Sequence, residues 1–137
     1  MLVERVKYKD FDGNEREEKF YFNFTEAELT EMELSTKGGL KNEIQRIMDS
    51  QDQSEIIKIF KNLLLKAYGV KSPDGKRFIK DEQLTKEFEQ TNAYSQLFMK
   101  LAFDDEAAAK WINGVIPQEI AKELDTNTTP ALTPVNN

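Results

Sequence analysis

The 137-residue sequence contains no histidine and no cysteine. These two side chains supply most nucleophiles and most zinc and copper ligands of proteins, and histidine is the usual proton shuttle near neutral pH. Their absence excludes Ser-His-Asp and Cys-His hydrolysis, zinc chemistry and a disulfide scaffold. A sequence without cysteine also suits a reducing compartment.

Positive charge is in deficit, with 19 Lys and Arg against 25 Asp and Glu and a net charge of −6. Non-specific binding to nucleic acid or anionic lipid depends on cationic surfaces. Residues 1–5 carry charge where a signal peptide needs an apolar run, and nowhere is there an apolar stretch long enough to cross a bilayer. We therefore expect no nucleic-acid partner, no membrane partner and a location in the cytoplasm where the chain is made.

Apolar residues make up 39% of the sequence and include nine phenylalanines, which is enough to build a real core in a chain of one-domain length. The pattern predicts an α+β, mostly helical fold in which an N-terminal β-hairpin (1–24) packs on five to seven short helices (25–124). We expect one globular domain over 1–124. Residues 125–137 are rich in Thr, Asn and Pro, and we expect a flexible tail there.

The hairpin is predicted from alternating residues in two extended segments, 2–8 and 17–24. Residues 10–14 between them are typical of a turn, because Gly and Asn tolerate positive φ. Their acidic residues also suggest a calcium loop, but that loop needs Gly at its sixth position and Glu at its twelfth. Here the Gly is fourth and position twelve is Tyr21, so the turn is favoured.

Helical periodicity begins after the hairpin, at a capping box formed by Thr25 and Glu28. The most apolar helix, from about Ser54 to Tyr68, is predicted to be central and to end at Gly69 as its C-terminal cap. Residues 72–75 predict a β-turn, and 76–80 follow as a short strand or a loop.

Later helices are predicted from their caps. Asp81 and Asp104 each precede a helical pattern, Gly114 is expected to stop the second of these helices, and Pro117 can begin a last short helix that reaches Leu124.

No cluster of polar residues indicates an active site. Residues 104–106 are all acidic and suggest either a magnesium site or a helix N-terminus, where anions are favoured, and we prefer the second interpretation. Lys76, Arg77 and Lys80 beside Phe78 suggest a phosphate site but lack a glycine-rich cradle, so a solvated loop is favoured. We predict no catalytic, cofactor-binding or metal-binding residues.

Four segments, taken in order, resemble the small tail assembly chaperones of long-tailed (siphovirus) phages and prophages of Gram-positive bacteria. The segments are 12–36, 68–78, 91–99 (Thr-Asn-Ala-Tyr at its start, Phe-Met at its end) and 113–117 (Asn-Gly-Val-Ile-Pro). The resemblance covers nearly all of residues 1–124. It implies a non-enzymatic protein without cofactors that binds the tape measure protein and keeps it soluble during tail assembly, in the host cytoplasm and not in the mature virion.

The same resemblance implies a second, longer form made by ribosomal frameshifting, through which the tail tube protein becomes a partner; self-association is also compatible with it. A chaperone of this kind needs apolar surface, and the candidate partner-binding residues are Tyr21, Phe78, Phe103 and Trp111. For any single one of the four, core packing is the favoured explanation, and most strongly so for Trp111. An acidic, phage-encoded regulatory or inhibitory binding protein is the alternative function, and a carboxylate-only enzyme is a third.

Overall fold

The structure of the chain is a computed structural model that describes residues 1–35, 38–49 and 52–116. The short helix predicted from Pro117 to Leu124 and the tail predicted for 125–137 lie outside the described residues.

The described residues form four strands and six helices, which confirms the α+β prediction. In chain order the elements are β1 (Leu2–Lys9), β2 (Glu15–Phe22), α1 (Glu26–Ser35), α2 (Leu40–Asp49), α3 (Gln53–Ala67), β3 (Tyr68–Lys71), β4 (Phe78–Ile79), α4 (Glu82–Glu89), α5 (Asn92–Phe103) and α6 (Asp105–Val115). The predicted N-terminal hairpin is β1–β2. Residues 76–80, which the sequence left open, contain the two-residue strand β4.

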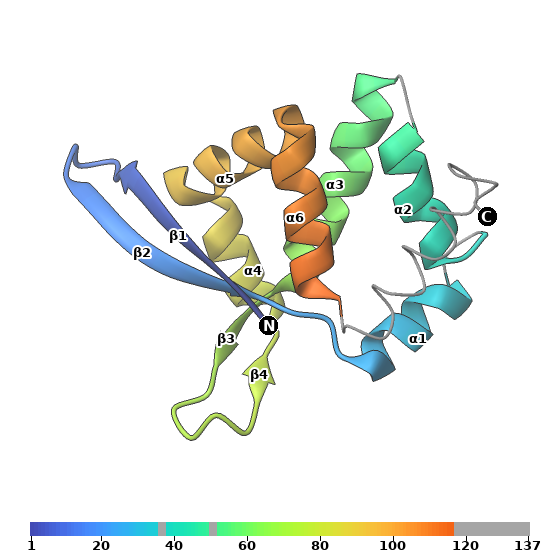
Figure 1. Ribbon diagram of the computed structural model, residues 1–137. Coiled ribbons are helices and arrows are strands. Elements are labelled where there is room, and N and C mark those ends of the chain that lie inside the picture. The colour runs from blue at the N-terminus through green and yellow to red at the C-terminus, as the bar shows by residue number, and fades with distance from the viewer. Residues whose placement is uncertain (36–37, 50–51, 117–137) are drawn as a thin grey trace.

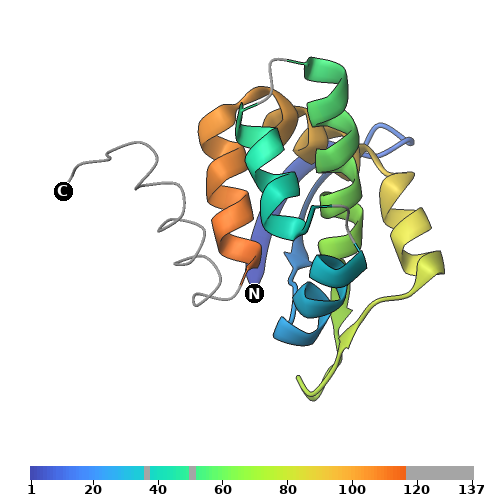
Figure 2. The ribbon, with the colours of Figure 1, turned by 90° about the vertical axis from the view of Figure 1, so that its right-hand side faces the viewer.

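The four strands form one antiparallel sheet in the order β1-β2-β3-β4. The hairpin is long and leaves the body of the protein at its turn, whereas the shorter β3–β4 hairpin projects from the other end of the sheet (Figure 1). The described helices lie on one side of the sheet, and the view turned by 90° shows them in front of it (Figure 2). The sheet therefore has a covered inner face and an outer face that no described helix covers.

Asp10 builds the turn of the first hairpin. Its Oδ1 accepts hydrogen bonds from the backbone N–H groups of Asp12 (3.0 Å) and Asn14 (2.9 Å), and its Oδ2 accepts one from Arg16 Nε (2.7 Å). Gly13 has a φ of 84°, the left-handed conformation that favours glycine. The carboxylate thus serves the turn itself, as an Asx turn does, which agrees with the preference for a turn over a calcium loop.

The core lies between the inner face of the sheet and α3, α5 and α6. Phe60 and Leu64 of α3 are fully buried, so the predicted central position of this helix is confirmed. Trp111 of α6 is 1% exposed, and its ring centroid lies 5.4 Å from that of Phe60 and 5.8 Å from that of Phe22. Tilted and edge-on ring contacts of this kind add to the stabilisation that burial alone supplies.

Helix starts follow the sequence closely. The capping box is formed as predicted, since Thr25 N donates to Glu28 Oε1 (2.9 Å) and Glu28 N donates to Thr25 Oγ1 (3.1 Å). Asp81 and Asp104 accept from backbone N–H groups in the first turns of α4 and α6. These bonds satisfy amides that the helix itself leaves without partners.

The ends of the helices agree less well with the sequence predictions, and two predictions for glycines were wrong. Gly69 is not the C-terminal cap of α3, because that helix ends at Ala67 and Gly69 lies inside β3. Gly114 does not stop α6, which continues to Val115. At both positions a neighbouring side chain lies where a Cβ would stand: Phe78 at Gly69 and Leu2 at Gly114. Close packing, and not helix termination, explains the glycine at each site.

Candidate interaction surface

The outer face of the sheet is defined by the strand register. Val3 pairs with Tyr21, Tyr21 pairs with Gly69, and Lys71 pairs with Phe78, and residues directly opposite one another in antiparallel strands project to the same side. Val3 is 45% exposed. With the alternate residues of each strand, the outer face consists of Val3, Arg5, Lys7, Lys9, Glu15, Glu17, Lys19, Tyr21, Lys71 and Phe78.

Gly69 allows the aromatic part of this face to form. A Cβ at position 69 would lie 2.6 Å from Phe78 Cε2, so the phenyl ring occupies the space above the glycine. Gly69 pairs with Tyr21, whose ring also has the ammonium of Lys71 5.7 Å from its centroid. Tyr21 and Phe78, 57 residues apart in the sequence, are therefore close neighbours of one glycine, with a cation beside them.

The charge of the outer face differs in sign from that of the whole chain. The face carries five basic residues (Arg5, Lys7, Lys9, Lys19, Lys71) and two acidic ones (Glu15, Glu17), while the chain has a net charge of −6. Arg5 and Glu17 are the closest opposite pair, with Nη1 3.4 Å from Oε2. An exposed ion pair of this kind contributes little to stability. The remaining cations are available to attract a partner with carboxylates.

Lys80 ties the edge of this face to the start of α1. Its Nζ donates to Glu28 Oε2 (2.7 Å) and to the carbonyl of Asn23 (2.8 Å), and it lies 4.8 Å from the centroid of Phe24. Burial lowers the pKa of Lys80 below its ordinary value despite the attraction of Glu28. Burial raises the pKa of Glu28, but the hydrogen bonds from Lys80 and Thr25 outweigh it, so this pKa is lowered. The Lys80 ammonium thus serves the fold and is not a free phosphate ligand.

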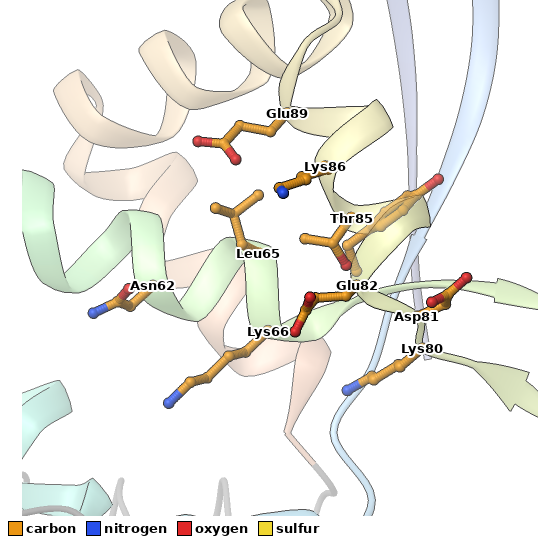
Figure 3. Close-up of a pocket in the computed structure, with 10 residues that line it drawn as sticks. Asn62, Leu65, Lys66, Lys80, Asp81, Glu82, Thr85, Lys86 and Glu89 are labelled. Carbon is orange, nitrogen blue, oxygen red and sulfur yellow. The ribbon is translucent and has the colours of Figure 1, made fainter.

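A hollow of about 380 Å³ lies between α3 and α4, and its lining residues are drawn in Figure 3. Its wall includes Asn62, Leu65 and Lys66 from α3 and Glu82, Thr85, Lys86 and Glu89 from α4. Its lining includes three basic residues (Lys66, Lys80, Lys86) and three acidic ones (Asp81, Glu82, Glu89). Beside it, Lys61 Nζ pairs with Glu89 Oε2 at 3.0 Å. Such a balanced lining offers neither an anion nor a cation a preferred position.

The structure separates the four candidate partner-binding residues. Tyr21 and Phe78 lie together on the outer face, half-buried. Phe103, at the end of α5, is 54% exposed but is not part of that face. Trp111 is in the core and offers no surface in this fold. Sequence reasoning missed Val3 and the basic residues of the outer face, although the alternation of apolar and basic residues in 2–9 carried that signal.

The acidic run 104–106 lies at the N-terminus of α6, as preferred from the sequence, where Asp104 Oδ1 accepts from the N–H groups of Glu106 (3.1 Å) and Ala107 (3.2 Å). Within the described residues no group of three or more acidic side chains is arranged to hold a metal ion. In the same part of the chain, no helix combines the length and the apolar character needed to span a membrane.

The described residues form an α+β fold whose sheet has one face that no described helix covers and that is partly apolar. The family model for phage tail assembly chaperones matches residues 1–137, so the chain belongs to the phage tail assembly chaperone family. That membership supports a chaperone role in tail assembly, with protein partners in the phage tail. Neither a curated protein nor a solved structure was found to match the chain.

Proposed function

We propose that the chain binds the tape measure protein of its phage and keeps this protein soluble while the tail is assembled. The family match over the whole chain carries the proposal. The role needs protein binding and no chemistry, which agrees with the absence of histidine and cysteine from the sequence. We place the encounter in the host cytoplasm, before tail completion, and do not expect the chain in the mature virion.

The outer face supports this proposal as the place of contact. An apolar partner is kept soluble when its apolar surface is covered by a surface that is apolar at its centre and charged around it. Val3, Tyr21 and Phe78 supply the apolar centre, and Arg5, Lys19 and Lys71 supply the charge. Partners of this kind gain most from aromatic residues that lie near the centre of the contact.

A longer form of the chain would extend the same role. In this proposal, frameshifting near the end of the gene adds a domain that binds the tail tube protein, and residues 125–137 act as the tether between the two activities. The tether sets the effective concentration of the tube protein near the tape measure protein.

Co-expression tests the proposal. The tape measure protein of the same phage should be soluble and should co-purify with the wild-type chain, and should precipitate without it. A Tyr21→Ser/Phe78→Ser variant should lose most of this effect, because both aromatic groups leave the outer face. Leu34→Ser is the matched control, since Leu34 is an apolar residue of α1 with 83% exposure that lies outside this face.

Two results would contradict the proposal. The first is a tape measure protein that is equally soluble with and without the chain. The second concerns only the surface: a double variant that folds like the wild type and still solubilises its partner would move the contact away from the outer face.

A further inference from the structure

The strand β1 is the end strand of the sheet, and half of its backbone polar groups point away from the sheet. Asp10 N donates to Asn14 O at 2.9 Å, which fixes the alternation of hydrogen bonds along the hairpin. With the observed register, Glu4, Val6 and Tyr8 exchange hydrogen bonds with β2. The N–H and C=O groups of Val3, Arg5 and Lys7 must then face the free edge.

An independent contact confirms this direction. The side-chain amide of Asn92, at the start of α5, donates to the carbonyl of Lys9 at 2.9 Å. Lys9 belongs to the same alternating set of β1 residues as Val3, Arg5 and Lys7, so its carbonyl also faces away from β2. Asn92 satisfies the edge at this end, and among the described residues none pairs with the edge groups of residues 3–7, which we call the free stretch.

A hollow of about 170 Å³ lies alongside that free stretch. It is lined by Glu4, Arg5, Val6, Lys7, Gln96, Leu97 and Lys100, so β1 forms one wall and α5 forms the other. The helix therefore stands back from the edge over these residues. A side chain of an added strand that pointed to the inner side would enter this hollow beside Leu97.

The charges around the edge select what can pair with it. Arg5 and Lys7 project to the outer side of the edge, and Lys100 lies on the α5 side, where its Nζ is 3.9 Å from Glu4 Oε1. A second copy of β1 would bring its own Arg5 and Lys7 against these cations, and like charges on adjacent strands are unfavourable. Lysine on an edge strand is a common protection against such self-pairing. A strand with carboxylates at alternate positions would instead place opposite charges beside Arg5 and Lys7, which is favourable.

We propose that the edge of β1 over residues 3–7 accepts an extended acidic segment of a partner protein as a fifth strand of the sheet. The backbone of the segment pairs with the N–H and C=O groups of Val3, Arg5 and Lys7. Its carboxylates lie beside Arg5 and Lys7, and its intervening side chains, small and apolar, enter the hollow beside Leu97. This site uses the backbone edge of β1, whereas the contact proposed above for the tape measure protein uses the outer face of the sheet, and the two share residues Val3 and Arg5.

A synthetic peptide of alternating glutamate and valine serves as the probe. Titrated into the ¹⁵N-labelled full chain, it should slow amide hydrogen exchange at Val3, Arg5 and Lys7, whose N–H groups gain partners. A peptide of alternating lysine and valine should produce no such protection. Protection by both peptides, or by neither, would overturn the proposal.

Two variants separate backbone pairing from charge. Lys7→Pro removes both the ammonium and the edge N–H, and proline is tolerated on edge strands where no ladder bond is lost. Lys7→Ala, the matched control, removes the ammonium and keeps the N–H. The affinity for the glutamate peptide should fall at least about tenfold for proline and less than that for alanine, since a lost donor also leaves a peptide carbonyl unpaired. Equal losses would contradict strand addition.

N-methylated peptides test the same point without changing the protein, in case Lys7→Pro disturbs folding. Every second amide of an added strand faces β1. Methylation of this alternate set of peptide amides should abolish binding, because these amides donate to β1. Methylation of the other alternate set, whose amides face away from β1, should leave binding intact. Equal effects of the two methylation patterns, or a peptide-induced dimer of the chain with the same protected amides, would reject the proposal.

Discussion

Gly69 shows how a single missing side chain shapes a surface. Its position in β3 leaves space for the ring of Phe78, and Gly69 itself pairs with Tyr21 on the outer face. In the sequence this glycine follows a long apolar helix and has the appearance of a helix cap. The close approach of a residue nine positions away could not be predicted, because local sequence contains no information about which strand will pair.

Gly69→Ala tests this contact. The new Cβ would lie 2.6 Å from Phe78 Cε2 and 2.9 Å from the carbonyl oxygen of Ile79, so the free energy of unfolding should fall by about 1–3 kcal/mol. Urea unfolding followed by circular dichroism gives the value. The double variant Gly69→Ala/Phe78→Ala should lose less than the sum of the single variants, because the ring is no longer there to clash. Strict additivity would show that the two residues do not touch.

Trp111 is the residue whose core role matters most for stability. Its side chain is 1% exposed, and its indole Nε1 has no hydrogen-bond partner among the described residues. Trp111→Ala should cost about 3–5 kcal/mol because it leaves a large cavity, whereas Trp111→Phe should cost roughly 1–2 kcal/mol because it removes no hydrogen bond. Unfolding should be followed by circular dichroism and not by tryptophan fluorescence, because both variants remove the one tryptophan of the sequence. A loss for Trp111→Phe as large as that for Trp111→Ala would contradict this account, because alanine leaves the larger cavity.

At the scale of elements, the sequence predicts starts better than ends. Thr25 with Glu28, Asp81 and Asp104 each begin a helix as expected, because a cap acts within three residues of itself. Strand β3 was not predicted, because residues 68 and 69 were expected to end the preceding helix. Strand β4 was left open as a short strand or a loop, since a two-residue strand is defined by its partner and not by its own pattern. The uncovered outer face was not predicted, because it depends on which side the helices take.

Glu28 joins two elements, and its charge gives a pH dependence. Because the pKa of its carboxyl is lowered in the folded chain, the stabilisation is present above the ordinary value of 4.5 and is lost as the pH falls through the folded-state pKa. Glu28→Gln should therefore cost about 1 kcal/mol at pH 7, and the difference from wild type should shrink towards pH 3. Thermal melts between pH 7 and pH 3 measure it. Glu26→Gln, in the same turn but without the bonds to Thr25 and Lys80, should show a smaller difference; an equal one would contradict the role of Glu28.

At the scale of the whole molecule, one buried cluster connects the sheet with α3, α5 and α6. The absence of histidine and cysteine excluded Ser-His-Asp and Cys-His hydrolysis and zinc chemistry. The order of four sequence segments indicated the family that the whole-chain match shows. The surface that contacts a partner could not be predicted from composition or from sequence segments, because it depends on how distant strands and helices come together.

Deletion of residues 125–137 tests where the folded domain ends. Thr, Asn and Pro there cannot compensate for the entropy of ordering a chain, about 1–2 kcal/mol per residue. The melting temperature of the truncated protein should equal that of the full chain within error. A clear decrease would show that the tail is part of the domain.

The most direct test of the proposed function is light scattering from purified tape measure protein as it is diluted out of denaturant, with increasing amounts of the chain present. We predict that scattering falls in proportion to the added chain and that a soluble complex of the two proteins appears by size exclusion, whereas the Tyr21→Ser/Phe78→Ser variant has little effect. Scattering that does not change with added wild-type chain would contradict the proposal that this protein keeps the tape measure protein soluble.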